Sequence, residues 1–310
     1  MPSGRDGAIV RFMNDHGQVV VVTGSNSGFG RLISETLARE GFVVFATMRA
    51  LNGRNAAAAA ELRELARKNS KSLHVLEMDV TSDASVEKCI GEVLRQGGRI
   101  DALVNNAGFG YGGLTETFTM PQMQKIFDTN VFGAMRTIRM VLPQMHKQGG
   151  GLLLQVSSGG GRVIVPGMGL YCASKFALEA LTESFHYDLA GQGIDCVSIA
   201  PGAYPTGIAQ KIAGGDDPAR ADVYGPIRDV PQRVIDQVAA SQANPQEIAD
   251  KVLEIIRTAA GQRALRYRVG GGAPGVEAIN QVCEQVQQQV LAAFGISEET
   301  KFRGKAAAAD

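Results

Sequence analysis

The sequence predicts an α/β fold in which a doubly wound, parallel sheet forms a single domain. Short apolar, β-branched runs alternate with helical patterns along the chain, as expected for buried strands that helices connect. The 310 residues are 45% apolar, which is enough for a substantial core. Length alone would allow one or two domains, but no linker, internal repeat or long charge run divides the chain.

The strands and helices are expected to alternate through the first two thirds of the chain. Strands are expected at residues 18–22, 42–47, 73–78, 102–105, 151–157 and 194–200. Helices are expected at about 32–41, at 56–68, from 82 or 83 to about 96, at about 120–145, and around Tyr171. This alternation predicts a core of about residues 17–206, with ligands beyond the carboxyl ends of the strands.

The rest of the chain is expected to cover this core. Residues 207–240 are punctuated by Gly, Asp and Pro and predict a small helical lid, followed by C-terminal helices at about 241–300 and a flexible tail at 301–310. The lid has apolar residues that could cover a substrate or only pack within the lid: Ile208, Ile212, Val223, Tyr224, Ile227 and Val230. A helix at 278–294 has an apolar stripe that we expect to be buried: Ile279, Val282, Val286, Val290, Leu291 and Phe294.

A glycine-rich turn joins the first expected strand to the first expected helix. It reads Thr23-Gly24-Ser25-Asn26-Ser27-Gly28-Phe29-Gly30. Glycines allow a tight turn, and they let backbone N–H groups approach an anion at the N-terminus of the helix. A simple tight turn would have the same composition, but the strand before it and the helix after it favour dinucleotide binding.

Tyr171 and Lys175 lie four residues apart on an expected helix, and therefore on one face of it. A free tyrosine has a pKa near ~10, which is too high for useful proton transfer at neutral pH. A nearby ammonium group stabilises the phenolate and lowers that pKa. The pair can therefore exchange a proton near neutral pH, although the same spacing also occurs on ordinary helices.

The ordered set of motifs resembles the short-chain dehydrogenase/reductase family over roughly residues 17–300. The matching elements are Thr23-Gly24-xxx-Gly28-x-Gly30, Asp79-Val80, Asn105-Asn106-Ala107-Gly108, Asn130, Ser158, Tyr171-xxx-Lys175 and Pro201-Gly202-xxx-Thr206. The segments 45–49, 108–113 and 128–133 look most like the branch of hydroxysteroid and retinol dehydrogenases. The resemblance implies a Rossmann-type fold and hydride transfer between a nicotinamide cofactor and a ketone or secondary alcohol.

The resemblance also implies catalytic roles. Ser158 would hydrogen-bond the reacting oxygen, Tyr171 would exchange the proton, and Lys175 would lower the pKa of the tyrosine and hold the nicotinamide ribose. Asn130 would kink its helix and hold a water that leads to Lys175, although it could simply be a kink residue that bonds a backbone carbonyl. Ser157 is the alternative to Ser158, but the family places its serine thirteen residues before the tyrosine, which is the position of Ser158.

A larger set is implied to bind the cofactor. Asp79 and Val80 would meet the adenine, although Asp79 could simply receive a loop amide. Residues 105–108 would line the ribose side and brace the sheet, although this run could be only a turn. The full set is Gly24, Ser25, Ser27, Gly28, Phe29, Gly30, Arg49, Asp79, Val80, Asn106, Ala107, Gly108, Tyr171, Lys175, Pro201 and Thr206.

The choice of cofactor depends on Met48 and Arg49. Met48 stands where NAD-preferring members of the family have an aspartate, which accepts from the ribose 2′-hydroxyl and repels a 2′-phosphate. Arg49 can pair with a phosphate and stack on adenine, although it could also be a solvated surface residue. Ser27 is not basic, so a second basic contact is missing. We therefore expect NADP, with NAD possible.

The composition argues against several other classes of protein. Acidic and basic residues number 31 each, so nothing suggests nucleic acid or an anionic membrane as a partner. No apolar stretch reaches the ~18 residues of a membrane span, and residues 1–16 lack the apolar core of a signal peptide. The four cysteines lack metal-binding spacing, so we expect no metal site and reduced thiols in a cytoplasmic protein. A catalytic thiol at Cys172 stays open.

We expect an NADP(H)-dependent oxidoreductase for a lipophilic ketone or alcohol, such as a steroid or retinoid, because the lid is apolar. An acyl- or polyketide-ketone reductase is the alternative within this class. A non-catalytic dinucleotide-binding sensor and a nucleotide-sugar epimerase or dehydratase are disfavoured by the intact Tyr171/Lys175 pair and the chain length. The resemblance implies a homodimer or homotetramer built on four outer-face residues: Phe127, Met135, Leu178 and Phe185.

Overall fold

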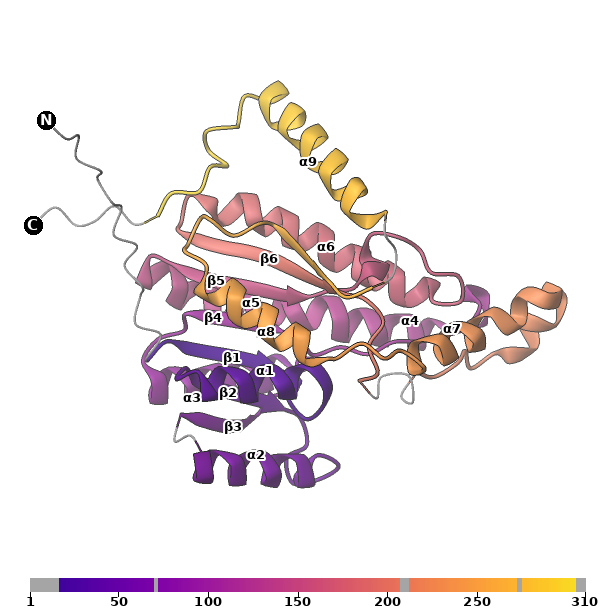
Figure 1. Ribbon diagram of the computed structural model, residues 1–310, viewed down its shortest axis with the longest axis horizontal. Coiled ribbons are helices and arrows are strands. Elements are labelled where there is room, and N and C mark those ends of the chain that lie inside the picture. Colours follow the sequence, from indigo (N-terminus) through magenta and orange to yellow (C-terminus); the bar gives the residue numbers. More distant parts are fainter. Residues whose placement is uncertain (1–16, 70–71, 207–211, 272–274, 305–310) are drawn as a thin grey trace, which may run out of the picture.

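The computed structural model describes residues 17–69, 72–206, 212–271 and 275–304 (Figure 1). Within these ranges one parallel sheet has the strand order β3-β2-β1-β4-β5-β6-β7. The strands are β1 (Val19–Thr23), β2 (Val43–Met48), β3 (Leu73–Glu77), β4 (Ala102–Asn105), β5 (Gly151–Val156), β6 (Ile194–Pro201) and β7 (Arg266–Val269). The order reverses between β1 and β4, which confirms the doubly wound, Rossmann-type fold.

Helices cover both faces of the sheet. They are α1 (Gly28–Arg39), α2 (Ala56–Asn69), α3 (Asp83–Gly97), α4 (Met120–Phe127), α5 (Gly133–Gln148), α6 (Gly169–Ala190), α7 (Val230–Ala239), α8 (Gln246–Arg257) and α9 (Val276–Ala293). Each face has its own apolar core, and β1 contributes to both because its side chains alternate. Val20 and Val22 pack in the core that includes α1, α2 and α8, whereas Val19 and Val21 pack in the core that includes α3 and α5.

The helix expected at residues 120–145 is interrupted at Asn130. α4 ends at Phe127, a π-helical turn spans Asp128–Phe132, and α5 begins at Gly133. The N–H of Gly133 donates to the carbonyl of Asp128, five residues earlier. Such single π turns are rare and are frequently found at functional sites.

The C-terminal region contains a strand that the sequence pattern does not reveal. β7 lies within the stretch expected to hold only helices, and it extends the sheet beyond β6. Its four residues, Arg-Tyr-Arg-Val, are all half-buried and include two arginines. Hydropathy therefore does not mark them as a buried strand.

The prediction of a buried apolar stripe on α9 is wrong for most of its residues. Figure 1 shows α9 at the outer edge of the molecule, beyond α6. Leu291 of the stripe is buried, together with Val276 and Asn280. The rest of the stripe is exposed: Ile279, Val282, Val286, Val290 and Phe294. An amphipathic pattern identifies the apolar side of a helix, but it does not say whether the same chain covers that side.

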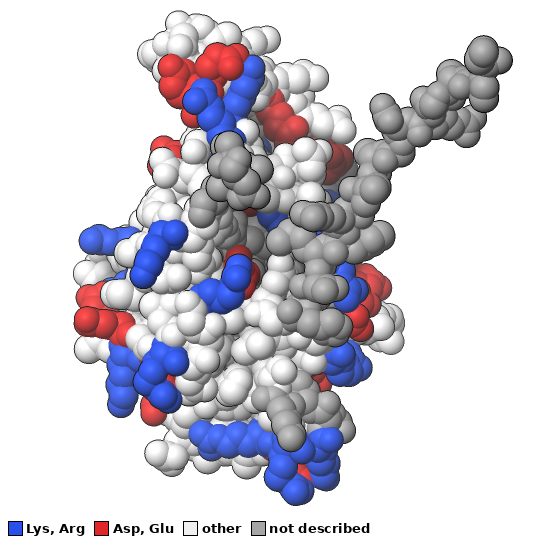
Figure 2. Space-filling model, turned by 90° about the vertical axis from the view of Figure 1, so that its left-hand side faces the viewer, with Lys and Arg blue, Asp and Glu red and all other residues white. Residues whose placement is uncertain are grey.

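The surface at the amino ends of the strands carries charges of both signs. Figure 2 shows Lys and Arg interspersed with Asp and Glu on the described part of this face, without one continuous basic area. This distribution agrees with the zero net charge of the chain. Among the described residues, no helix is both long enough and apolar enough to span a membrane.

Candidate active site

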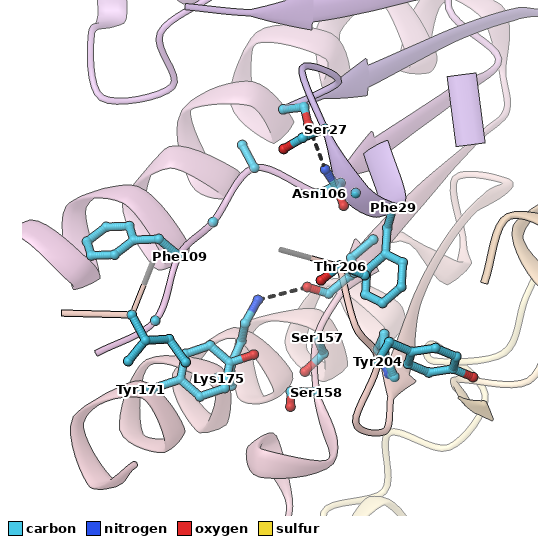
Figure 3. A pocket seen from close by; sticks show the side chains of 18 of the residues that line it. Ser27, Phe29, Asn106, Phe109, Ser157, Ser158, Tyr171, Lys175, Tyr204 and Thr206 are labelled. Carbon is cyan, nitrogen blue, oxygen red and sulfur yellow. Dashed lines mark hydrogen bonds between the residues drawn. The ribbon is translucent and has the colours of Figure 1, made fainter. Parts of the chain in front are cut away.

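The carboxyl ends of the strands open onto a large cleft, with a volume of about 1120 Å³. That slightly exceeds the ~300–1,000 Å³ of ordinary ligand pockets. The glycine turn after β1 and the serine pair after β5 line the cleft, and α6 lies along it (Figure 3). It brings together most of the predicted site residues: Gly24, Ser27, Gly28, Phe29, Arg49, Asp79, Val80, Asn106, Ala107, Gly108, Ser158, Tyr171, Lys175, Pro201 and Thr206.

The glycine turn is held in place by Thr23 and Asn106. The Thr23 hydroxyl oxygen accepts from the backbone N–H of Asn106 at 3.0 Å and of Ala107 at 2.9 Å. The Asn106 side-chain amide donates to the carbonyls of Thr23 at 2.9 Å and Gly24 at 3.1 Å. The run after β4 therefore braces the turn after β1.

Ser25 and Gly30, which are predicted to contact the cofactor, make contacts inside the glycine turn. The Ser25 hydroxyl donates to the Val22 carbonyl at 3.0 Å, and its backbone N–H donates to the Thr47 carbonyl at 2.9 Å. A Cβ on Gly30 would collide with the side-chain amide of Asn106. Neither residue lines the cleft, and direct contact of Ser25 and Gly30 with the cofactor stays a prediction. Sequence spacing identifies the turn but not which of its groups face outward.

Three arginines line the end of the cleft beside β2 and β3. Arg31 is engaged with Glu35 at 2.8 Å and also with Glu61. Arg49 and Arg54 are exposed and make no ion pair within the described residues. Sequence reasoning found Arg49 but missed Arg54, although a second arginine so soon after the same strand was a usable signal.

Asp79 faces these arginines from the end of β3. Its carboxylate accepts from the backbone N–H of Thr81 at 3.0 Å and from the Thr81 hydroxyl at 2.7 Å. Burial acts to raise the pKa of Asp79, but the Thr81 hydrogen bonds and the charges of Arg49 and Arg54 outweigh it and leave the pKa below its usual value. The side chain thus receives a loop amide, as the simpler interpretation allowed, while it also lines the cleft.

Tyr171, Lys175 and Ser158 meet at the opposite end of the cleft. Figure 3 shows Tyr171 and Lys175 reaching from α6 into the cavity, with Ser158 close by. The Lys175 ammonium donates to the Val156 carbonyl at 2.8 Å and lies 5.9 Å from the centre of the Tyr171 ring. The Ser158 hydroxyl oxygen accepts from the Gly160 N–H at 3.1 Å, and the same side chain hydrogen-bonds Tyr171.

The electrostatics of this pair differ from the expectation based on spacing alone. Burial raises the pKa of Tyr171, and its hydrogen bond with Ser158 opposes that change without cancelling it. Burial also lowers the pKa of Lys175 to about 8, although the Glu179 carboxylate acts in the opposite direction. The net lowering of the tyrosine pKa that the spacing predicts is not found in the cofactor-free site, because desolvation dominates for both groups.

Ser157 and Cys172 occupy different environments from their neighbours. The Ser157 hydroxyl is buried and finds no hydrogen-bond partner among the described residues. Cys172 is fully buried beside Tyr171, and burial raises the pKa of its thiol. A thiol held neutral in this way is a poor nucleophile, so the structure argues against catalysis by Cys172.

Asn130 lies behind Tyr171 and Lys175, in the π-helical turn. Its Nδ2 donates to the Phe109 carbonyl at 2.9 Å and to the Ser174 hydroxyl at 3.0 Å, and its Oδ1 accepts from the Phe109 N–H at 3.0 Å. Gly108 fits between Asn130 and Lys175, since a Cβ there would lie 3.1 Å from Asn130 Oδ1 and 3.8 Å from Lys175 Nζ. Asn130 thus ties the loop after β4 to α6.

Comparison with known proteins identifies the family. A profile of the short chain dehydrogenase family matches residues 18–216. The chain belongs to the short-chain dehydrogenase/reductase family. It is 34% identical to retinol dehydrogenase 8 of Bos taurus, over 80% of each chain, and 34% identical to estradiol 17-beta-dehydrogenase 1 of Rattus norvegicus, over 80% of this chain and 72% of that one. The protein is therefore an oxidoreductase.

A solved structure supports the same assignment. An actinorhodin polyketide ketoreductase, solved as a point variant with NADPH, is 28% identical and superposes with a TM-score of 0.68, covering 84% of this chain and 98% of that one. A nicotinamide dinucleotide fits the cleft of this dehydrogenase/reductase. Gly24 is pressed against Ala107, where a Cβ would lie 2.9 Å from its Cα, so the backbone forms a close cradle before the N-terminus of α1. Within the described ranges no cluster of three or more His, Cys, Asp or Glu could hold a metal ion.

Proposed function

We propose that this short-chain dehydrogenase/reductase is an NADP(H)-dependent enzyme that interconverts a lipophilic ketone and its secondary alcohol. One observation carries the proposal: one cleft has Tyr171, Lys175 and Ser158 at one end and, at the other, Arg49 and Arg54, which form no ion pair with any described residue. The first group suits proton exchange with a carbonyl oxygen. The second suits a phosphate dianion.

The catalytic roles follow from where the side chains lie. Ser158 orients the substrate oxygen beside Tyr171, which donates its proton in reduction and removes one in oxidation. Lys175 holds a positive charge near the phenol and stabilises the phenolate that proton donation leaves. Asn130 fixes α6 and the loop after β4 relative to each other. When bound, the nicotinamide supplies or accepts the hydride.

NADP preference is supported by the charges around Met48. This residue, at the end of β2, is buried and apolar, so its position offers no carboxylate to repel a 2′-phosphate. The charges of Arg49 and Arg54 both act to lower the pKa of the neighbouring Asp79. Both side chains are therefore close enough to this end of the cleft to bind an anion there. Arg54 thus supplies the second basic contact that the residue before Gly28 does not.

Titration of cofactor binding by nicotinamide fluorescence tests this preference. A charge-assisted contact contributes roughly 1.5–3 kcal/mol, so we expect Arg49→Ala to weaken NADPH about ten- to a hundredfold and NADH little. Arg54→Ala is expected to act in the same direction, and Met48→Asp to shift preference towards NADH. Arg63→Ala, an exposed arginine of α2 that does not line the cleft, is the matched control. Wild-type preference for NADH would overturn the assignment, and equal losses for both cofactors would show that Arg49 only stacks on adenine.

The substrate end of the cleft has an apolar wall. It is formed by residues of α7 and of the loops after β5 and β6: Val163, Val165, Met168, Ile212, Val234, Ile235 and Val238. Of the lid residues expected to cover the substrate, Ile212 lines the cleft, whereas Val223, Tyr224 and Ile227 are exposed. Val230 does not line it either, and Ile208 lies outside the described residues. α7 contributes Val234, Ile235 and Val238 to the apolar wall, and the loops after β5 and β6 contribute the other four residues.

A substrate panel distinguishes the candidate activities. We expect NADPH absorbance to fall with bulky apolar ketones such as steroid or retinoid analogues, and little with small polar ketones. Activity confined to acyl- or polyketide-type ketones would favour the alternative, which the similarity to a polyketide ketoreductase supports. Tight cofactor binding without turnover on any ketone or alcohol would contradict the enzymatic proposal in favour of a sensor.

We also propose a two-fold symmetric dimer or tetramer through the outer faces of α4–α6. Leu178 is buried within the chain and cannot contribute, whereas Phe127, Met135 and Phe185 are half-buried. Phe132 and Phe176, on the same helical segments, are exposed apolar residues available for such a contact. Light scattering that shows only monomer at micromolar concentration would contradict this assembly.

A further inference from the structure

A row of buried polar side chains crosses the sheet behind the catalytic helix. Gln155 of β5 pairs in register with Ser198 of β6, which pairs with Arg266 of β7. Residues paired in this way point to the same face of a sheet. That face is covered by α6, because the side chains of Ser198 and Arg266 both bond Glu179 of that helix.

Glu179 is the centre of this row. Its Oε2 accepts from Ser198 Oγ at 3.1 Å and from Arg266 Nε at 3.0 Å, and Arg266 Nη2 donates to Glu183 at 2.6 Å. Glu179 is only 2% exposed. It follows Lys175 by one helical turn, so the two side chains lie on one face of α6.

Several polar atoms of the row find no protein partner. Within the described part of the chain, Glu179 Oε1, Ser157 Oγ and Arg266 Nη1 are buried without a hydrogen bond, as is the side-chain amide of Gln155, which lies beside the Cys196 thiol. Buried polar atoms are almost always satisfied by protein or by ordered water. These atoms are therefore candidates for holding water.

Gly161 packs against Glu179, Ser157 and the backbone of Lys175, and so brings these three residues to one place. A Cβ on this glycine would be 3.0 Å from both Glu179 Cγ and Ser157 Oγ, and 3.1 Å from the Lys175 carbonyl. Ser157 directly follows Val156, whose carbonyl accepts from Lys175 Nζ at 2.8 Å. The end of β5 thus meets Lys175 through Val156 and the polar row through Ser157.

We propose that Glu179 is a positioning residue for Lys175, and that it holds, with Ser157, a buried water directly beneath the catalytic centre. Its carboxylate supplies the negative charge that keeps the lysine protonated while the lysine is buried, and Arg266 and Ser198 hold that carboxylate in place. The proposal rests on the proposed function only in assigning Lys175 a catalytic role. The geometry of the site does not depend on the substrate.

The charged groups around Lys175 are few among the described residues. Tyr171 and Glu179 flank it on its own helix, and Glu183 and Arg266 lie behind Glu179. The end of β5 presents only the Val156 carbonyl and two serines, and the π-helical turn presents a neutral asparagine side chain. Glu179 is also the charge that acts to raise the pKa of Lys175 against the effect of burial. Removing its charge should therefore make the lysine easier to deprotonate.

The decisive measurement is an NMR titration of Lys175 in the cofactor-free, full-length protein. Lysine labelled with ¹³C at Cε reports the protonation state, and the Lys175→Met variant assigns the signal. We expect Glu179→Gln to lower the midpoint by about one pH unit or more, a tenfold change in proton affinity. An unchanged midpoint would overturn the proposal. Because no turnover is measured, failure here is distinguishable from failure of the proposed activity.

Asp195→Asn is the matched control. Asp195 is also buried on β6, pairs with Arg263 and accepts from the Gly261 N–H at 3.1 Å. It lies near the amino end of the strand, three residues before Ser198, and so points to the other face of the sheet. This variant loses a buried carboxylate without touching the polar row, so the Lys175 midpoint should stay unchanged. A shift as large as that of Glu179→Gln would mean that loosening of the fold, not the Glu179 charge, moves the lysine.

Two further measurements complete the test. If Glu179→Gln does not fold, the double variant Glu179→Gln/Arg266→Met removes both charges of the pair and is titrated in its place. Its midpoint should still fall, because the charge of Glu179 acts on the pKa of Lys175 and no comparable effect of Arg266 is seen, and an unchanged midpoint overturns the proposal. A high-resolution crystal structure should show a water bound to Glu179 Oε1 and Ser157 Oγ, and its absence would refute the water site.

Discussion

Lys175→Met should make the cofactor-free protein more stable near neutral pH while it abolishes catalysis. The lysine is 5% exposed, and burial lowers its pKa from the ordinary 10.5 to about 8. Below pH 8 the folded protein therefore carries a buried ammonium group, whose burial opposes folding. Methionine has a similar length and no charge, and it is compatible with an apolar interior.

The size of the effect follows from this change in pKa. A fall of about 2.5 pH units at 1.36 kcal/mol per unit corresponds to about 3 kcal/mol. Loss of the hydrogen bond to the Val156 carbonyl leaves a buried acceptor unpaired, which costs about 1–3 kcal/mol. We therefore expect a net stabilisation of up to about 2 kcal/mol at pH 7.

The sign of the pH dependence provides a second criterion. Between pH 8 and 10.5 the unfolded chain holds this proton and the folded protein has released it, so the free energy of unfolding contributed by Lys175 rises with pH across that window. The depressed pKa destabilises the folded protein by its full amount below pH 8, and this destabilisation has disappeared above pH 10.5. The advantage of Lys175→Met over wild type should therefore shrink as the pH rises from 8 towards 10.5.

Urea unfolding of both proteins, without cofactor, at several pH values across this window measures the difference. Tyrosines and cysteines also titrate there, but they are common to both proteins and cancel in the comparison. Lys125→Met, which removes an exposed lysine of α4, is the control and should change stability little. A Lys175→Met protein that is less stable than wild type at pH 7, or an advantage that grows with pH, would refute the reasoning.

Three further outcomes are expected. Tyr171→Phe should lower kcat by about 10²–10⁴-fold with nearly unchanged cofactor affinity, and steady-state rates above a tenth of wild type would contradict its role as proton donor. Thr23→Val leaves the N–H groups of Asn106 and Ala107 without their acceptor and should destabilise the fold by about 1–3 kcal/mol for each, as a lower melting temperature would show. Gly30→Ala would force a Cβ to within 2.5 Å of the Gly24 carbonyl oxygen and should weaken NADPH binding more than tenfold by fluorescence titration. The matched Gly91→Ala on α3, where a Cβ meets nothing, should not change binding.

The sequence was sufficient to predict the first six strands and the doubly wound arrangement. Those strands are apolar runs bounded by turns, and all but the edge strand β3 are buried along most of their length, which leaves little ambiguity. β7 was missed because it is short and carries Arg266 and Arg268. Its position depends on pairing with β6 and on the Glu179 and Glu183 carboxylates, which are more than 80 residues away in sequence. Contacts over that separation leave no local periodicity.

The sequence predicted which residues form the site, but it did not predict the direction of their pKa changes. Motif spacing brought Tyr171, Lys175 and Ser158 to one place, yet it could not give the sign of the tyrosine pKa change, because desolvation is a property of the folded interior. Arg54 was missed for a related reason. The turn that follows β2, with Ala50 at a positive φ of 52°, brings Arg54 back to the cleft, and a chain conformation of that kind is rare outside glycine.

The catalytic helix therefore has two requirements that conflict. In the proposed mechanism Lys175 must stay charged to assist Tyr171, but its burial favours the neutral form. The fold offsets part of this conflict with a second buried charge, Glu179, which needs Arg266 and Ser198 in turn. That dependence explains why β7 has an arginine where an apolar residue would pack without needing an ionic partner. It also implies that the strand most difficult to find in the sequence is the one that connects the edge of the sheet to the catalytic lysine.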